Sequence, residues 1–215
     1  MKQAAKGVGL RELNKQEKLQ RIKSAALELF LTNGFDETTT RDIASRANVA
    51  MGTVFIYAET KRDLLFLIVN EDLEDCIARA AANVDPKAPI LANLLKALQI
   101  HYEYFARNPV VSRAALREMY FYQSGKQSER FLATRDKLRS LLTRLIAEAL
   151  ANGQIKSTEA PEIIAQTIFA VYQVDLRIWL SSEKPKIGPG MDALRRKLEI
   201  VIRGLNPRKS ALEAT

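Results

Sequence analysis

The stretch TTTRDIASRANVAMGTVFIYAETKRDLL, residues 38–65, holds two helix-start patterns close together. Thr39 is followed three residues later by Asp42, and Thr60 is followed three residues later by Asp63. In this spacing the hydroxyl oxygen can accept a backbone N–H of the first helical turn, and the carboxylate lies near the positive end of the helix. We therefore predict that one helix begins near residue 40 and that another begins after residue 60.

A tight turn is predicted between these two starts. Asn48 tolerates the left-handed backbone conformation, and Val49 can fill the angle between two crossing helices. Gly52 and Thr53 then fall in the first turn of a short helix that ends before Glu59. Two such helices bury little apolar surface, but the second can enter the major groove of DNA. The stretch predicts a helix-turn-helix, and an ordinary corner of a helical bundle is the alternative.

Positive charge is concentrated at the N-terminal end. The 215-residue chain has a formal net charge of +8, and residues 1–24 hold seven cations and two anions. Net charge alone is a weak indicator of partners, but a basic segment beside a helix-turn-helix favours a polyanion such as double-stranded DNA. We expect residues 1–14, which are mostly polar with two glycines, to form a basic flexible arm.

The rest of the chain has the apolar periodicity of helices. Apolar residues recur at spacings of three and four, and no alternating run bounded by turn residues indicates a strand. Proline, glycine and asparagine-glycine breaks end the successive helices. We predict an all-α fold of about nine helices, with a helix-turn-helix domain over residues 15–62 and a larger helical domain over residues 63–215.

The helix predicted over about residues 161–180 is apolar around nearly its whole circumference. Such a helix must be buried on more than one side, and a second copy of the chain can cover the second side. Together with the last helix it would form a four-helix dimer interface, and a deep core within one chain is the alternative. The residues predicted at this interface are Ile168, Tyr172, Trp179, Leu194, Leu198, Val201, Ile202 and Leu205.

Residue types that carry catalysis or metal binding are scarce. The single cysteine, Cys76, allows no internal disulfide and no cysteine-based metal cluster, and the single histidine, His101, has no carboxylates predicted to converge on it. The sequence lacks a glycine-rich phosphate loop, a metal-ligand spacing and a serine elbow. We expect no enzymatic activity, no cofactor and no metal. The competing class is a helical adaptor or ligand-binding protein without specific DNA binding.

Cysteine usage and hydropathy also bear on the compartment. A lone thiol fits a reducing environment, and the sequence has no apolar run of about 18 residues and no apolar segment behind its N-terminal lysines. We expect a cytoplasmic protein with no membrane partner.

Residues 21–65 resemble the N-terminal DNA-binding domain of the TetR family of one-component transcriptional regulators. This resemblance covers about a fifth of the chain, and the remainder is similar to the family only in helical character. It implies a homodimeric repressor that binds a roughly palindromic operator and dissociates from it when a small-molecule effector enters the C-terminal domain. The positions that carry the resemblance are Ala25, Ala26, Leu29, Phe30, Gly34, Phe35, Thr39, Asp42, Ile43, Ala44, Ala47, Val49, Gly52, Thr53, Tyr57, Lys61, Leu64 and Leu65.

The resemblance identifies the segment Met51 to Tyr57 as the recognition helix. It implies phosphate contacts from Thr39, Thr53, Tyr57 and Lys61, and it implies that Arg41, Met51, Gly52 and Ile56 lie nearest the bases. The complete set of residues implied at the DNA is Thr39, Thr40, Arg41, Ala50, Met51, Gly52, Thr53, Phe55, Ile56, Tyr57 and Lys61.

Few of these side chains can donate a hydrogen bond to a base edge. We therefore expect thymine methyl contacts and DNA shape to carry much of the specificity. Inward packing of Met51 and Ile56 is the alternative.

An effector site is predicted where aromatic residues gather in the larger domain. An apolar pocket with a few polar anchors is typical of small-molecule sites, and Arg117 could anchor an anion. An ordinary aromatic core is the alternative. The predicted lining is Tyr102, Phe105, Arg117, Tyr120, Phe121, Leu142 and Tyr172.

If Lys61 contacts phosphate, Lys61→Ala weakens binding to all duplex sequences about equally. The slope of log affinity against log salt concentration then falls by about one, because one fewer counterion is released on binding. Titrations of operator and random duplexes at several salt concentrations measure this slope. An unchanged slope would remove Lys61 from the phosphate contacts.

Overall fold

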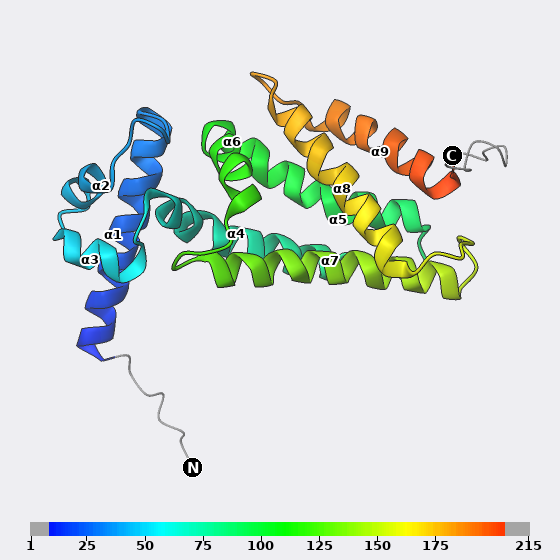
Figure 1. The fold of residues 1–215 in the computed structure, drawn as a ribbon, viewed down its shortest axis with the longest axis horizontal. Coiled ribbons are helices and arrows are strands. Elements are labelled where there is room, and N and C mark those ends of the chain that lie inside the picture. Colours follow the sequence, from blue (N-terminus) through cyan, green and yellow to red (C-terminus); the bar gives the residue numbers. More distant parts are fainter. Residues whose placement is uncertain (1–8, 205–215) are drawn as a thin grey trace, which may run out of the picture. The chain divides into compact units, whose positions relative to one another are not determined.

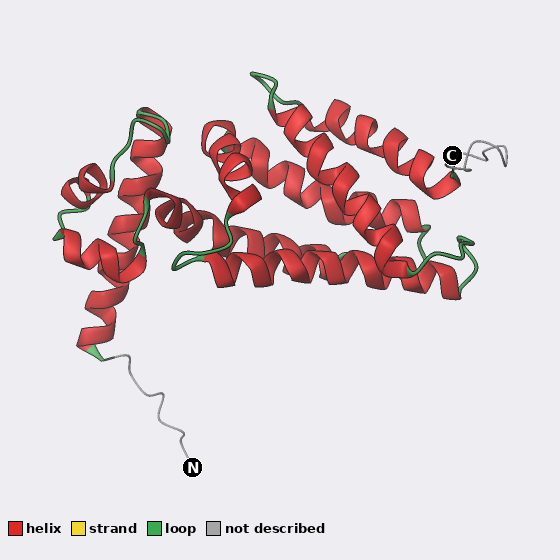
Figure 2. Cartoon of the chain, viewed as in Figure 1, coloured by secondary structure: helices red, strands yellow, loops and turns green. Residues whose placement is uncertain are grey.

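The computed structural model describes residues 9–204, and all regular secondary structure in this range is helical (Figures 1 and 2). No strand occurs between residues 9 and 204, which confirms the predicted all-α fold. The described helices are α1 (Leu10–Thr32), α2 (Thr40–Arg46), α3 (Met51–Tyr57), α4 (Lys61–Ala82), α5 (Ile90–Arg107), α6 (Pro109–Glu118), the short 3-10 helix η1 (Met119–Phe121), α7 (Ser128–Ala151), α8 (Pro161–Leu180) and α9 (Ile187–Arg203).

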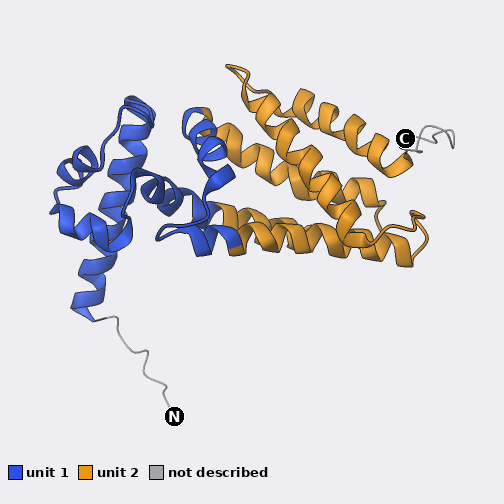
Figure 3. Cartoon of the chain, in the orientation of Figure 1, with its two compact units in different colours: residues 1–72, 110–132 blue, residues 73–109, 133–215 orange. Residues whose placement is uncertain are grey.

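The chain divides into two compact units (Figure 3). Unit 1 takes residues 1–72 and 110–132, and unit 2 takes residues 73–109 and 133–215. Most of α6, all of η1 and the first turn of α7 therefore belong with the N-terminal helices, although they lie within the predicted domain 63–215. Helix α4 contributes residues to both units.

In unit 1, helix α2 packs against both α1 and α3 (Figure 1). Ile22, Ala26 and Phe30 of α1 are fully buried, as are Ile43 of α2 and Val54 of α3. Small alanines between these larger side chains let the helices approach closely.

The start of α1 corrects one prediction. Helix α1 begins at Leu10, directly after Gly9, so residues 10–14 are helical and do not form a flexible arm. The segment contains good helix formers such as Leu10, Glu12 and Leu13, which explains why the helix extends this far. The remainder of the predicted arm, residues 1–8, lies outside the described residues.

In unit 2, helices α5, α8 and α9 pack against one another around a buried polar contact. The hydroxyl of Tyr102 on α5 donates to Oδ2 of Asp175 on α8 at 2.8 Å, and Lys197 on α9 pairs with the other carboxylate oxygen. Asp175 is buried, and a buried carboxylate needs such partners to remain charged. This contact ties the three helices together at one point.

The residues predicted at a dimer interface divide into two groups. Ile168, Tyr172, Leu194 and Leu198 are fully buried within the chain, so for these four the prediction is corrected to core residues of the protomer. Trp179, Val201 and Ile202 are half-buried, and Leu205 lies outside the described residues. Periodicity could not separate the two sides of α8, because both sides are apolar. The exposed large apolar side chains of α8 and α9 are Ile163, Val174, Ile178 and Ile200.

His101 of α5 is buried in unit 2, with its ring centroid 5.8 Å from that of Tyr172. The sequence pattern predicts a partly exposed, structural histidine, and the burial of His101 corrects the predicted exposure. Burial lowers the pKa of His101 from 6.5 to about 4, because the charged form is poorly solvated inside the protein. The imidazole is therefore neutral in the folded chain at neutral pH.

Unfolding at mildly acid pH is predicted to take up a proton at His101. Because the folded pKa lies below the unfolded value, stability falls as pH drops through the unfolded pKa and continues to fall until the folded pKa is reached. Between pH 7.5 and pH 5 we expect a loss of about 2 kcal/mol in the free energy of unfolding. Denaturant titrations of the wild type and of His101→Gln measure it. An equal loss in both proteins would show that other groups cause it.

Candidate nucleic-acid interface

Helix α2 begins with the predicted capping box. The backbone N–H of Asp42 donates to Oγ1 of Thr39 at 3.1 Å, and the backbone N–H of Thr39 donates to Oδ2 of Asp42 at 2.9 Å. Hydrogen bonds from the hydroxyl and the backbone N–H of Thr39 lower the pKa of Asp42. The carboxylate is therefore charged at neutral pH and fixes the first turn of α2.

The turn between α2 and α3 has the backbone predicted for it. Asn48 adopts a positive φ of 50°, and the N–H of Val49 donates to the carbonyl of Ala44 at 3.1 Å. The Arg21 side chain of α1 also reaches this turn: its Nε donates to the carbonyl of Ala47 at 2.9 Å and its Nη2 to the carbonyl of Asn48 at 2.5 Å. Arg21 of α1 thus fixes the turn through the backbone carbonyls of Ala47 and Asn48.

Arg21 was missed as a functional residue in the sequence. It is one cation among several in α1, and no spacing rule predicts that it reaches residues 26 and 27 positions away. Only the three-dimensional approach of α1 to the turn distinguishes it from its neighbours.

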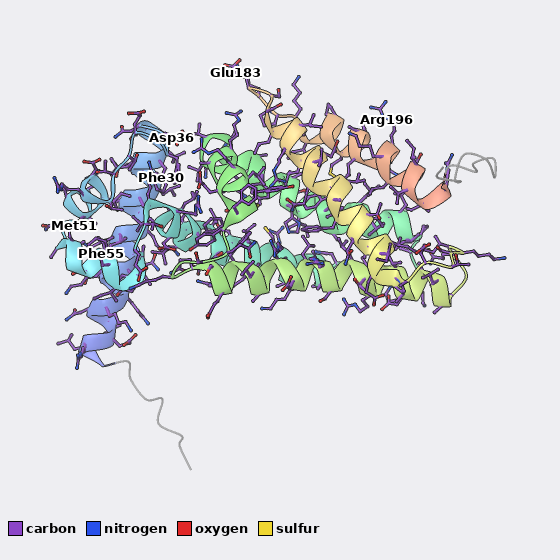
Figure 4. The ribbon with its side chains drawn as sticks, viewed as in Figure 1. Phe30, Asp36, Met51, Phe55, Glu183 and Arg196 are labelled. Carbon is purple, nitrogen blue, oxygen red and sulfur yellow. The ribbon has the colours of Figure 1, made fainter. Side chains whose placement is uncertain are left out.

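Helix α3 presents an apolar outer face. Val54 is fully buried and anchors the helix, whereas Phe55 is 44% exposed and Ile56 is 62% exposed. Met51 is half-buried and lies at the outer edge of the helix (Figure 4). Ile56 therefore does not pack inward. The Gly52 position has no heavy atom within 4 Å of an added Cβ, so this face is open to close approach by a ligand.

Three of the predicted phosphate contacts have partners within unit 1, and one of them is Thr39, whose hydroxyl donates to Oδ2 of Asp42 at 2.6 Å. The hydroxyl of Tyr57 donates to the carbonyl of Lys15 at 3.2 Å, and Nζ of Lys61 donates to the carbonyl of Asp36 at 2.7 Å. Lys61 also lies 4.6 Å from the ring centroid of Phe35. An ammonium group has three donors, so a phosphate can still accept from Lys61.

The residues predicted to line an effector pocket lie in different surroundings. In unit 2, Tyr102, Phe105, Leu142 and Tyr172 are buried. In unit 1, Tyr120 is 64% exposed and Phe121 is 77% exposed.

Arg117, predicted as an anion anchor, has two carboxylate partners in unit 1. Its Nη2 lies 2.6 Å from Oδ1 of Asp36, and its Nε lies 3.1 Å from Oε1 of Glu118. Within residues 9–204, no group of three or more potential metal ligands is found. The pocket stays a prediction.

Comparison with known proteins identifies a family for the helix-turn-helix region. Residues 22–68 match the sequence model of the family described as "Bacterial regulatory proteins, tetR family". The match runs from the middle of α1 through α2 and α3 into the first turns of α4. Residues 22–68 therefore form a TetR-family DNA-binding domain. The chain is a DNA-binding transcriptional regulator.

Full-length relatives of this TetR-family regulator are also regulators. The chain is 25% identical over 173 residues to the fatty acid metabolism regulator protein of Bacillus subtilis, covering 79% of this chain and 87% of that protein. It is 28% identical over 173 residues to the transcriptional repressor KstR of Mycobacterium tuberculosis, covering 77% of this chain and 72% of that protein.

A solved structure shares the whole fold. The structure of the regulator FadR from Bacillus subtilis in complex with stearoyl-CoA superposes with a TM-score of 0.68 at 21% sequence identity. The superposition covers 87% of this TetR-family chain and 99% of that one. Both the helix-turn-helix and the larger helical region therefore follow the architecture of that regulator.

Removing the Arg21 side chain is predicted to loosen the turn. Arg21→Ala leaves the carbonyls of Ala47 and Asn48 without their charged donor, and we expect the free energy of unfolding to fall by about 1–2 kcal/mol. Lys18→Ala, an exposed cation on the same helix, should change it by less than about 0.5 kcal/mol. Denaturant unfolding of both variants tests the role, and equal effects would contradict it.

Proposed function

We propose that this TetR-family regulator is a homodimeric repressor of a palindromic operator and that a fatty acyl-CoA thioester releases it from DNA. The single observation that carries the proposal is the exposed apolar face of α3. The helix is anchored in the core by the buried Val54, and the neighbouring α2 is fixed by its capping box. That arrangement suits insertion into a groove of DNA. We place its action in the cytoplasm, where its operator DNA lies.

The dimer is supported by apolar surface on α8 and α9. Val174 and Ile178, one helical turn apart, are 56% and 62% exposed, and Ile200 of α9 is 54% exposed. Exposed apolar side chains at helical spacing mark surfaces that another protein covers. A second copy that packs α8 and α9 against the same helices would bury them on both chains.

Helix α8 is also long and apolar enough to cross a membrane by length and composition, and about a third of its apolar stretch is buried within the protein. Asp175 lies near its middle, paired with Lys197 and Tyr102 inside unit 2. A charged, buried network of this kind suits a water-soluble core better than a helix surrounded by lipid. This observation favours the dimer as the partner of the exposed face.

A two-fold symmetric dimer explains why the operator should be palindromic. Each copy presents one recognition helix, and the two helices can bind two half-sites about 34 Å apart in successive major grooves. An effector would then act by favouring a separation of the two heads that does not fit this spacing.

The proposed effector class follows from a groove in unit 2 and from the relatives. Helices α4 and α7 border an open groove of about 610 Å³ whose walls include the small or apolar residues Ala78, Ala81 and Leu141. Lys137 and Arg144 lie in the same groove, together with the carboxylates of Glu74 and Asp136. Apolar walls suit an acyl chain, and cations suit the phosphates of coenzyme A. FadR from Bacillus subtilis, which shares this fold, binds stearoyl-CoA in its solved structure.

Helix α4 is proposed to couple the effector groove to the DNA-binding helices. It starts at Lys61 beside the DNA-binding head and continues to Ala82, where its last turns border the groove. If effector and operator favour different positions of α4, each must weaken binding of the other by the same factor.

The first experiment is selection of random duplex DNA with the purified full-length protein at near-physiological salt. We expect an enriched palindrome with two half-sites about 10 base pairs apart, and release of that duplex by stearoyl-CoA at concentrations where free coenzyme A and stearate have little effect.

Each part of the proposal can fail separately. Salt-sensitive binding without enrichment would contradict specific operator recognition and favour the helical adaptor. An enriched sequence without two-fold symmetry would contradict the dimer. An operator complex that is indifferent to stearoyl-CoA would contradict the effector class alone.

A further inference from the structure

The C-terminal end of the recognition helix needs hydrogen-bond partners from elsewhere in unit 1. A helix leaves its last four carbonyl groups without helical donors, and in the seven-residue α3 these belong to Val54, Phe55, Ile56 and Tyr57. The backbone N–H of Ala58 donates to Val54 at 3.0 Å. Ala58 is extended, so the chain leaves the helix at once and does not return to cap it.

Two residues that are about 70 positions away supply the remaining donors. Nζ of Lys126 donates to the carbonyl of Phe55 and lies 3.4 Å from that of Ile56. Nε2 of Gln127 donates to the carbonyl of Tyr57 at 3.0 Å. The segment between η1 and α7 therefore completes the hydrogen bonding of α3. An ammonium group at this end is also favoured by the helix dipole.

The same segment is fixed to the start of α4. The Tyr122 hydroxyl donates to Oδ1 of the buried Asp63, and accepts from the backbone N–H of Gln127 at 3.1 Å. Nδ2 of Asn70 donates to the carbonyl of Gln127 at 3.2 Å. Gly125, at a φ of 133°, packs so closely that an added Cβ would overlap Asp63 and Tyr122.

Asp63 is the charged centre of this attachment. Burial raises its pKa, but hydrogen bonds from Tyr122 and from the backbone N–H groups of Glu59 and Thr60 outweigh burial, and the net pKa lies below the ordinary value. The carboxylate thus stays ionised at neutral pH and holds three neighbouring parts of unit 1: the end of the α3–α4 connection, the first turn of α4 and the η1–α7 segment.

We propose that Lys126 and Gln127 are positioning residues for DNA recognition, which fix the orientation of the recognition helix through the backbone carbonyls of Phe55, Ile56 and Tyr57. Lys126 and Gln127 affect the affinity for the operator sequence and not the sequence-independent electrostatic affinity for duplex DNA. Nζ of Lys126 is occupied by these carbonyls and lies 3.7 Å from Oε1 of Glu59, so its charge is largely compensated within the protein.

This arrangement supplies a second route of regulation besides α4. The segment that holds α3 is continuous in the chain with α6 before it and α7 after it, and α7 borders the proposed effector groove. A shift of α7 along its axis would pull Lys126 and Gln127 from the end of α3. The recognition helix would then lose its partners, and the segment would also lose its contacts with Asp63 and Asn70 of α4.

The test uses substitutions that remove the donors and keep side-chain volume. Gln127→Glu replaces the donating amide by a carboxylate, and Lys126→Met keeps an unbranched stem without the ammonium. Lys126→Arg retains donors for the two carbonyls, and Lys96→Met, at an exposed lysine of α5 in unit 2, matches the change in net charge. For each full-length variant, affinities for the enriched operator and for a random duplex are measured at several salt concentrations.

We expect operator affinity to fall about tenfold in Gln127→Glu and in Lys126→Met, while affinity for random duplex and the salt slope stay at wild-type values. Lys126→Arg and Lys96→Met should remain within about twofold of the wild type. Amide exchange of residues 54–58 should rise in the two donor variants, with the thermal unfolding midpoint of the chain nearly unchanged.

Two results would overturn the proposal. Parallel loss of operator and random-duplex affinity in Lys126→Met, with a salt slope lower by about one, would make Lys126 a direct phosphate contact. Wild-type operator affinity in both donor variants would show that α3 keeps its orientation without them. Failure of the wild type to enrich any sequence would instead contradict the proposed operator recognition itself.

Discussion

A seven-residue helix in water does not hold its own shape, and the recognition helix α3 is such a helix. Its stability must come from neighbours. Val54 anchors it in the core of unit 1, Arg21 holds the turn before it, and Lys126 and Gln127 complete the carbonyls at its end. Each of these contacts comes from a different part of the chain, so the orientation of the head depends on the integrity of the whole unit.

This dependence suits a regulator better than a constitutive DNA-binding protein. A head built on its own core would be insensitive to events elsewhere in the chain. Here the donors at the end of α3 lie in the segment that continues into α7, and the same segment is bonded to α4; both helices contribute residues to unit 2. In the proposed mechanism, small displacements of those helices change DNA affinity without unfolding the DNA-binding helices, as coupling between two sites requires.

The sequence predicted the parts of the fold that depend on local chemistry. The Thr39–Asp42 and Thr60–Asp63 pairs marked helix starts that the structure confirms, and Asn48 marked the turn by its tolerance of positive φ. These signals lie within three or four residues of one another, which is the range over which capping and turn rules operate.

The contacts that hold the head in place could not be predicted in this way. Arg21 reaches Ala47 and Gln127 reaches Tyr57 across long stretches of chain, and nothing in the neighbourhood of either residue distinguishes it. The two sides of α8 were likewise indistinguishable, because buried Ile168 and exposed Ile178 have the same chemistry. Only the packing of unit 2 shows which side is inside.

The most direct test of this account is native-state hydrogen exchange of the full-length protein, resolved at the amides of α3 and of the segment from Tyr122 to Ser128. If the recognition helix depends on that segment, the two sets of amides open with the same free energy and gain protection together when operator DNA binds. Protection of α3 that persists while the segment opens would contradict the account.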